Sequence, residues 1–257
     1  MKRFDPEKSP NQFATSFGAW KATSENELPM APRSYISYLH SKVDQIPESF
    51  DSREEWGSQC PSLLEIRDQA NCGSCWAFAS STTWTDRNCI RTGGNFKADL
   101  SPQDILSCCS TCGNGCGGGY TSSAWVYFHE TGISTGGLYN GTGFSGTGCK
   151  PYSFAPCEHY VSGERVDCDS LPMSETPICT DSCVDEYTDN DYENDRVKAG
   201  KPVKFPYSVE DIQREIMTNG PVEANINVFS DFFAYQSGVY YHTYGKYEYT
   251  DGHEKFG

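Results

Sequence analysis

Apolar residues recur at helical spacing along the stretch that begins at Cys75. Trp84 and the apolar pair at residues 89–90 follow a run, residues 77–80, in which each residue favours or tolerates a helix. Two glycines at residues 93–94 supply the stop signal. The pattern therefore predicts a helix that begins near Cys75.

Start and stop signals predict three further helices. Ser101 and Pro102 suit the N-cap and the first helical position. Residues 121–129 have the pattern of a short apolar helix. Ser208 opens a capping box for a helix that ends at the Gly-Pro pair of residues 220–221.

Strand patterns come later in the chain. Every second residue from Val222 to Val228 is apolar, which is typical of a half-buried strand, and residues 238–241 have the pattern of another short strand. Helices first and strands afterwards indicate an α+β protein. We expect a helical lobe, a strand-rich lobe and a cleft between them.

The charge and the apolar content limit the partners. The chain of 257 residues carries a net charge of −15, which argues against nucleic acid and anionic membrane surfaces as partners. No apolar run approaches the length of a bilayer span, so we expect no membrane insertion.

The cysteine content points to an oxidising compartment. Thirteen cysteines are typical of a disulfide framework, and because the number is odd, at least one thiol lacks a partner within the chain. Residues 1–6 contain no apolar signal region, so we expect that the natural protein begins upstream of Met1. A thiol-rich cytosolic protein is the alternative.

The stretch from Gln69 to Cys75 carries the clearest chemistry. A thiol at a helix N-terminus meets unpaired backbone N–H groups and the positive end of the helix dipole, which favour the thiolate. Cys75 is therefore a candidate nucleophile. Gln69, six residues earlier, offers an amide N–H to an oxyanion formed on a carbonyl that Cys75 attacks.

The motif Cys-Gly-Ser-Cys-Trp at residues 72–76, together with Gln69, resembles the nucleophile signature of papain-like cysteine proteases. Residues 46–53 resemble the start of the mature enzyme in the cathepsin B group. The resemblance implies a papain-like two-lobed fold, with residues 47–257 as the peptidase domain. Residues 1–46 would be a propeptide remnant or leader that lies over the active site, and a disordered leader is the alternative.

The resemblance also implies a mechanism. Cys75 attacks the peptide carbonyl and forms a thioester, while His253 takes the thiol proton and later protonates the leaving amine. Gln69 and the backbone N–H of Cys75 bind the oxyanion, and Gly118 and Gly119 pair with the substrate backbone. Peptides or proteins are then the substrates of a lysosomal or secreted monomer that needs no metal and no cofactor.

Residues 157–168 resemble the occluding loop, a cysteine-closed insertion of the cathepsin B group. In that group two adjacent histidines hold the C-terminal carboxylate of the substrate, which adds dipeptidyl carboxypeptidase activity to endopeptidase activity. His159 matches the first histidine, and the resemblance implies that it pairs with Asp68. Tyr160 replaces the second histidine and carries no positive charge, so we expect weak exopeptidase activity at most.

The disulfide pattern of the family carries over to this chain. It implies six bridges, which are Cys60–Cys89, Cys72–Cys116, Cys108–Cys179, Cys109–Cys112, Cys149–Cys183 and Cys157–Cys168. This pairing leaves the candidate nucleophile Cys75 as the free thiol.

The chain departs from the family beyond His253. The family continues into a hydrophobic strand and an Asn-Ser-Trp segment whose asparagine orients the imidazole, whereas this chain ends at Gly257. We therefore expect an incomplete second lobe. A truncated, catalytically inactive papain-like protein is the alternative function, because loss of an orienting partner lowers the rate by orders of magnitude.

Two motifs allow other interpretations. Cys72 and Cys75 could form a redox pair, or a zinc site together with the cysteines of residues 109–116, unless Cys72 is bridged to Cys116. Asn-Gly-Thr at residues 140–142 is a glycosylation sequon, which is relevant only if the chain is secreted.

Overall fold

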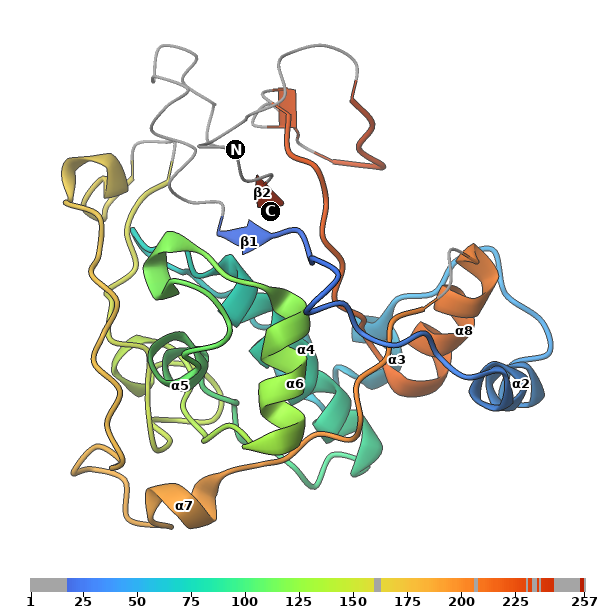
Figure 1. The fold of residues 1–257 in the computed structure, drawn as a ribbon, viewed down its shortest axis with the longest axis horizontal. Coiled ribbons are helices and arrows are strands. Elements are labelled where there is room, and N and C mark those ends of the chain that lie inside the picture. The colour runs from blue at the N-terminus through green and yellow to red at the C-terminus, as the bar shows by residue number, and fades with distance from the viewer. Residues whose placement is uncertain are drawn as a thin grey trace.

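Helices make up most of the regular structure in this computed structural model (Figure 1). The described residues are 18–159, 163–205, 208–229, 231–232, 235, 237–242 and 255–256. The helices are α2 (Arg33–Lys42), α3 (Ser52–Trp56), α4 (Cys75–Arg91), α5 (Pro102–Cys108), α6 (Thr121–Glu130), α7 (Tyr192–Asp195) and α8 (Val209–Asn219). Short 3₁₀ helices span Pro61–Leu64, Gly115–Gly117, Tyr139–Gly141 and Cys168–Ser170. Strands β1 (Ala19–Trp20) and β2 (Lys255–Phe256) pair antiparallel.

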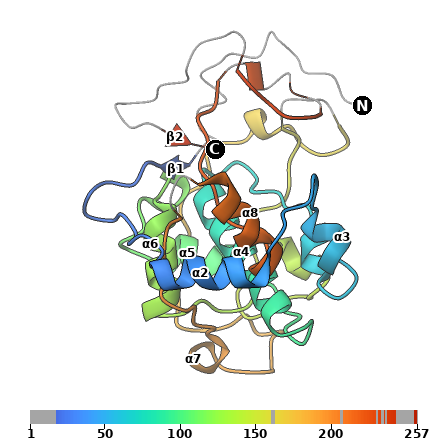
Figure 2. The ribbon, with the colours of Figure 1, turned by 90° about the vertical axis from the view of Figure 1, so that its right-hand side faces the viewer.

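Helix α4 is the central element, and it packs against α5 and α6 (Figures 1 and 2). It begins at Cys75, as its sequence pattern predicts. At its other end the amide of Gly93 donates to the carbonyl of Ile90 at 3.0 Å, and the amide of Gly94 donates to that of Cys89 at 2.9 Å. Both glycines have positive φ, which a residue without a side chain adopts at no steric cost. The two glycines therefore end the helix.

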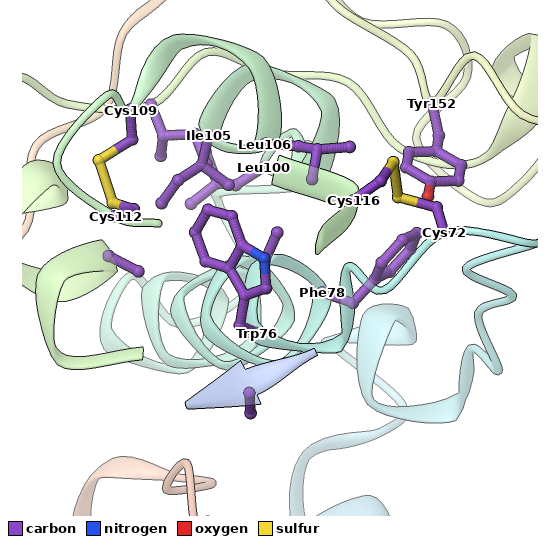
Figure 3. Packing of buried hydrophobic residues seen from close by; sticks show 14 of the residues in the cluster. Cys72, Trp76, Phe78, Leu100, Ile105, Leu106, Cys109, Cys112, Cys116 and Tyr152 are labelled. Atoms are coloured by element: carbon purple, nitrogen blue, oxygen red, sulfur yellow. A yellow bond between two sulfur atoms is a disulfide. The ribbon is translucent and has the colours of Figure 1, made fainter. Parts of the chain in front are cut away.

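Buried aromatic and aliphatic side chains surround the first turn of α4 (Figure 3). Trp76 is 1% exposed, and its Nε1 donates to the carbonyl of Gly115 at 3.1 Å. Phe78 meets the ring of Tyr152 edge-on, with centroids 4.7 Å apart. Leu100, Ile105 and Leu106 belong to the same buried cluster. The residue after Cys75 is thus fixed on all sides, which holds the thiol in place.

Six disulfides tie the loops to this core. Each of the bridges that the resemblance implies is present, and all thirteen cysteines lie within the described residues: Cys60–Cys89, Cys72–Cys116, Cys108–Cys179, Cys109–Cys112, Cys149–Cys183 and Cys157–Cys168. Cys75 is the free cysteine. Because Cys72 is bridged to Cys116, the redox-pair and zinc interpretations of these cysteines are wrong.

Helix α2 lies against α8 in both views (Figures 1 and 2). Leu39 is fully buried in this contact region, and the hydroxyl of Tyr35 donates to Oε2 of Glu215 at 2.8 Å. Arg87 of α4 forms an ion pair with the same carboxylate. The N-terminal region from residue 33 onward is therefore docked on the helical part of the protein, which differs from the disordered leader that the sequence left open.

The local helix signals are confirmed. Ser101 accepts a hydrogen bond from the amide of Asp104, and Ser208 accepts one from the amide of Asp211, so both serines act as N-caps. The helix expected over residues 121–129 spans Thr121–Glu130.

In the described residues the strand predicted over residues 222–228 is reduced to single bridges at Asn227 and, just beyond it, Phe229, and the strand predicted over residues 238–241 is not formed. Residues 222–228 and 238–241 are not assigned as strands in the described part of the chain, and Val239 is 89% exposed. A strand exists only where a neighbouring strand supplies the other half of its hydrogen bonds, and alternation alone does not provide that partner.

We predict that Trp76→Ala lowers the free energy of unfolding by about 3–5 kcal/mol, because it opens a cavity in a packed core and removes the hydrogen bond from Nε1 to the carbonyl of Gly115. Denaturant unfolding measures this. Val126→Ala on the partly exposed face of α6 is the control, since Val126 is 36% exposed, and it should cost far less. Equal losses for the two variants would contradict this description of the core.

Candidate active site

The thiol of Cys75 lies at the N-terminus of α4 and receives backbone N–H donors. The amide of Gly18 donates to its Sγ at 3.0 Å, and the amides of Ala19 and Trp76 also bind it. Ser74, the N-cap residue, does not cap the helix with its side chain. The N-terminal end of α4 is therefore directed to the sulfur, as the sequence predicts.

Burial nevertheless controls the protonation of this thiol. Burial raises the pKa of Cys75, while the amides of Gly18, Ala19 and Trp76 lower it, and the net pKa lies above its usual value. The expected activation of Cys75 by the helix N-terminus is therefore wrong for this covered state, because desolvation of the thiolate outweighs the N–H donors.

The residues just before Cys75 form a constrained turn. Gln69 donates from Nε2 to the carbonyl of Cys72 at 2.9 Å, and its own carbonyl accepts from the hydroxyl of Tyr152 at 2.8 Å. Ala70 has a φ of 54°, which is unusual for a residue with a side chain. The turn thus holds Gln69 beside the segment that leads into α4, with one N–H of its side-chain amide bound to the carbonyl of Cys72.

An extended segment of the same chain, residues 18–20, pairs with Gly119. The amide of Gly119 donates to the carbonyl of Gly18 at 2.7 Å, and the amide of Trp20 donates to the carbonyl of Gly119 at 2.8 Å. The ring of Trp20 meets that of Tyr120 edge-on at 5.0 Å. A peptide backbone therefore lies across both Cys75 and Gly119.

Glycine is required at several points of this contact. A Cβ atom on Gly18 would lie 1.8 Å from the carbonyl oxygen of Gly73. One on Gly118, whose φ is 112°, would lie 2.4 Å from Nε1 of Trp20. The sequence reasoning selected Gly118 and Gly119, and the structure places both against the extended segment. It missed Gly18, whose role depends on a residue far away in the sequence.

The loop closed by Cys157–Cys168 is attached to the turn before Cys75. His159 Nε2 lies 3.0 Å from Oδ1 of Asp68, which is the contact that the resemblance implies. Arg165 Nη1 lies 3.4 Å from Oδ2 of the same carboxylate. Burial raises the pKa of Asp68, but the hydrogen bonds from His159 and from the amide of Ala70 lower it more, so its pKa lies below the usual 3.8.

The candidate base, His253, lies outside the described residues, as does Tyr160. The other four histidines have partners elsewhere. His40 binds Asp211, His129 faces the carbonyl of Ala199, and His159 binds Asp68. His242 contacts Asp231 and stacks on the ring of Phe229 with centroids 3.8 Å apart. The structure gives none of these four a contact with Cys75.

Sequence reasoning missed Glu223. Burial raises the pKa of this carboxyl to about 8, and Trp125 Nε1 donates to its Oε2 at 2.5 Å. In its charged form Glu223 also raises the pKa of Cys75. Its position between apolar neighbours in an alternating stretch is typical of a solvent-facing residue, so the sequence carries no signal for its burial.

One group of side chains in the described part of the chain has the spacing of a metal site. Cys157, His159 and Cys168 lie close enough together to resemble a metal site, but the two sulfurs form a disulfide and offer no thiolate. None of the described helices combines the length and the apolar character that a membrane span needs.

Comparisons of the sequence with known proteins all point to the same family. The papain family cysteine protease model matches residues 46–254. The chain is 45% identical over 246 residues to cathepsin B-like cysteine proteinase 6 of Caenorhabditis elegans, a match that covers 93% of this chain and 64% of that protein. It is 46% identical over 203 residues to the gut-specific cysteine proteinase of the same organism, covering 79% of this chain and 57% of the relative.

A solved structure agrees with these sequences. ProCathepsin B S9 from Trypanosoma congolense superposes with a TM-score of 0.72 at 30% identity, covering 96% of this chain and 74% of that one. The chain spans about three fifths of the length of the curated relatives it matches. It has the papain-like fold that the resemblance implies, and it belongs to the papain family of cysteine proteases.

Proposed function

We propose that the chain acts as a cysteine-type endopeptidase of the cathepsin B kind, which hydrolyses peptide bonds through a thioester on Cys75. The observation that carries this proposal is the backbone of residues 18–20, which hydrogen-bonds to Gly119 and presents an amide to Cys75 Sγ at 3.0 Å. A site that holds an extended peptide on the sulfur of a free cysteine is suited to a peptide substrate.

The proposed chemistry follows from these positions. Cys75 Sγ attacks the carbonyl carbon, the peptide C–N bond breaks, and the thiol proton passes through His253 to the leaving amine. The amide N–H of Cys75 and the side chain of Gln69 stabilise the oxyanion, since Gln69 Nε2 carries two N–H donors and the bond to the carbonyl of Cys72 uses one of them. Water then hydrolyses the thioester and restores the thiol.

Residues 18–46 act in this proposal as a propeptide. Residues 18–20 cover Cys75, and α2 docks the segment on α8. The linker between them is exposed over most of residues 21–29 and contains a turn in which the amide of Asn26 donates to the carbonyl of Thr23. A protease can therefore reach the linker while the covering segment is still bound.

In this proposal the loop at residues 157–168 limits the exopeptidase activity. His159 is engaged by Asp68 and stands beside the turn that contains Gln69. With Tyr160 in place of a second histidine, one imidazole faces a substrate carboxylate, so dipeptidyl carboxypeptidase activity is weak relative to endopeptidase activity. The six disulfides support an oxidising location, lysosomal or secreted.

We predict that Gly18→Val exposes Cys75. The new side chain cannot fit beside the carbonyl of Gly73, so the segment leaves the sulfur and the rate of alkylation by iodoacetamide rises by about tenfold or more, equivalent to ~1.4 kcal/mol of lost docking. The pKa of Cys75 then falls, because burial no longer raises it, and the midpoint of alkylation moves to lower pH. Gly200→Val is the control, since a Cβ there meets open space. Unchanged alkylation in Gly18→Val would refute the covering role.

We predict that the Gly18→Val protein cleaves a fluorogenic peptide and is labelled at Cys75 by a thiol-directed epoxide. Adding Cys75→Ala should lower turnover on the order of 10³-fold or more, because the nucleophile is gone. Ala79→Ser, at an exposed position of α4, is the matched control and should leave turnover unchanged. Neither cleavage nor labelling in the Gly18→Val protein would support the inactive peptide-binding alternative.

We predict that Asp68→Asn loosens the loop at residues 157–168. Because the pKa of Asp68 is depressed in the folded protein, its stabilising contribution is present above pH ~4 and is lost as the pH falls below 3.8. At pH 5 the variant should exchange the amide hydrogens of Glu158 and Cys168 about 2–5-fold faster than the wild type. Glu164→Gln, exposed in the same loop, is the control. Identical exchange in Asp68→Asn and the wild type would show that the pair does not hold the loop.

A further inference from the structure

We propose that Asn140 is a modification site that carries an N-linked oligosaccharide. The acceptor sequence Asn-Gly-Thr at residues 140–142 has a residue other than proline in the middle, as the transferase requires. It is the single Asn-x-Ser/Thr sequence in the 257 residues. The proposal is independent of the peptidase function.

The sequon forms the apex of an exposed turn. Asn140 lies in the 3₁₀ helix Tyr139–Gly141, with φ 52° and ψ 31°, and it is exposed to solvent. The amide of Gly141 donates to the carbonyl of Leu138 at 3.1 Å, and that of Thr142 donates to the carbonyl of Tyr139 at the same distance. Turns of this kind stand out from the surface, so the side chain of Asn140 has solvent in front of it.

The turn has room for a bulky group because the contacts that fix this loop to the protein are made by other residues, 144–149. Ser145 donates to Oδ2 of the buried Asp99 at 2.6 Å, and the amide of Phe144 hydrogen-bonds to Glu65. Cys149, at the end of the loop, is fully buried in a disulfide. Thr142 and Gly143 are exposed together with Asn140. A sugar on Nδ2 of Asn140 therefore extends into solvent without displacing a packed side chain.

The disulfides supply the second, independent argument. Twelve of the thirteen cysteines are bridged, and such a framework forms in the secretory pathway, where the oligosaccharide is also transferred. A chain that folds in that compartment passes the transferase with its sequon available. The same argument excludes the cytosol, where the sequon has no meaning.

A lipid-linked oligosaccharide is the donor in the transfer step. Nδ2 of Asn140 attacks the anomeric carbon of an oligosaccharide carried on a polyprenyl diphosphate. The new C–N bond forms as the bond from that carbon to the phosphate oxygen breaks, the polyprenyl diphosphate leaves, and the amide loses one proton to a base of the transferase. No oxidant or reductant is involved.

A purely conformational role for Asn140 is the competing explanation, because asparagine tolerates a left-handed backbone better than most residues. Three variants separate the explanations. Asn140→Asp keeps the tolerance for positive φ but removes the acceptor amide. Thr142→Ala removes the hydroxyl that the transferase recognises, and Thr142→Ser keeps it, along with a donor to the carbonyl of Tyr139.

The test is the intact mass of the full chain, produced in mammalian cells behind a cleavable secretion leader and recovered from both the medium and the membrane fraction. We expect the wild type and Thr142→Ser to carry added mass that peptide N-glycosidase F removes, converting Asn140 to Asp in the tryptic peptide. Asn140→Asp and Thr142→Ala should have the mass of the bare chain. Wild-type protein at the bare mass in both fractions, or added mass that persists in Asn140→Asp, overturns the proposal.

Discussion

The close approach of two backbones at Cys75 is the constraint on which the candidate site depends. Residues 18–20 reach the sulfur because neither Gly18 nor Gly73 carries a side chain at the point of contact. Gly119 pairs with the same segment through both its amide, which donates to Gly18, and its carbonyl, which accepts from Trp20. The contacts with Gly119 are main-chain hydrogen bonds, and the backbone amide of Gly18 donates to the sulfur of Cys75, so the segment is held here through its backbone.

Two opposing electrostatic effects meet at the thiol. The N-terminus of α4 and the amides of Gly18 and Ala19 favour the thiolate, while burial of the sulfur disfavours it. Burial is the stronger effect, so the covering segment acts on the sulfur in two ways. It lies where our proposal places the substrate, and burial favours the protonated, less reactive form of the thiol. Glu223 raises the pKa of Cys75 further when it is charged, which its own pKa of about 8 confines to alkaline pH.

Much of the helical architecture could be predicted from the sequence because its signals are local. Ser101 and Ser208 cap their helices through residues three positions away, and the glycines at residues 93–94 end α4 within its last turn. The six disulfides followed from the resemblance alone, since spacing permits many pairings.

The failures share a non-local cause. Residues 222–228 alternate like a strand, but a strand also needs a partner that alternation does not specify. The pKa of Cys75 depends on Gly18, which lies 57 positions away in the sequence, so a local argument from the helix N-terminus gave the wrong direction. The burial of Glu223 likewise depends on Trp125 of another element. The base His253 lies outside the described residues, so its role stays a prediction.

The central claim is that residues 18–20 cover a reactive cysteine that otherwise binds extended peptides. The most direct measurement is labelling of the wild-type chain with a peptidyl epoxide before and after limited proteolysis of the linker at residues 21–32, with the adduct located by peptide mapping. The account predicts an adduct on Cys75 after cleavage of the linker and little or none before it. An equal rate of labelling in the intact chain, or an adduct on any residue other than Cys75, would contradict it.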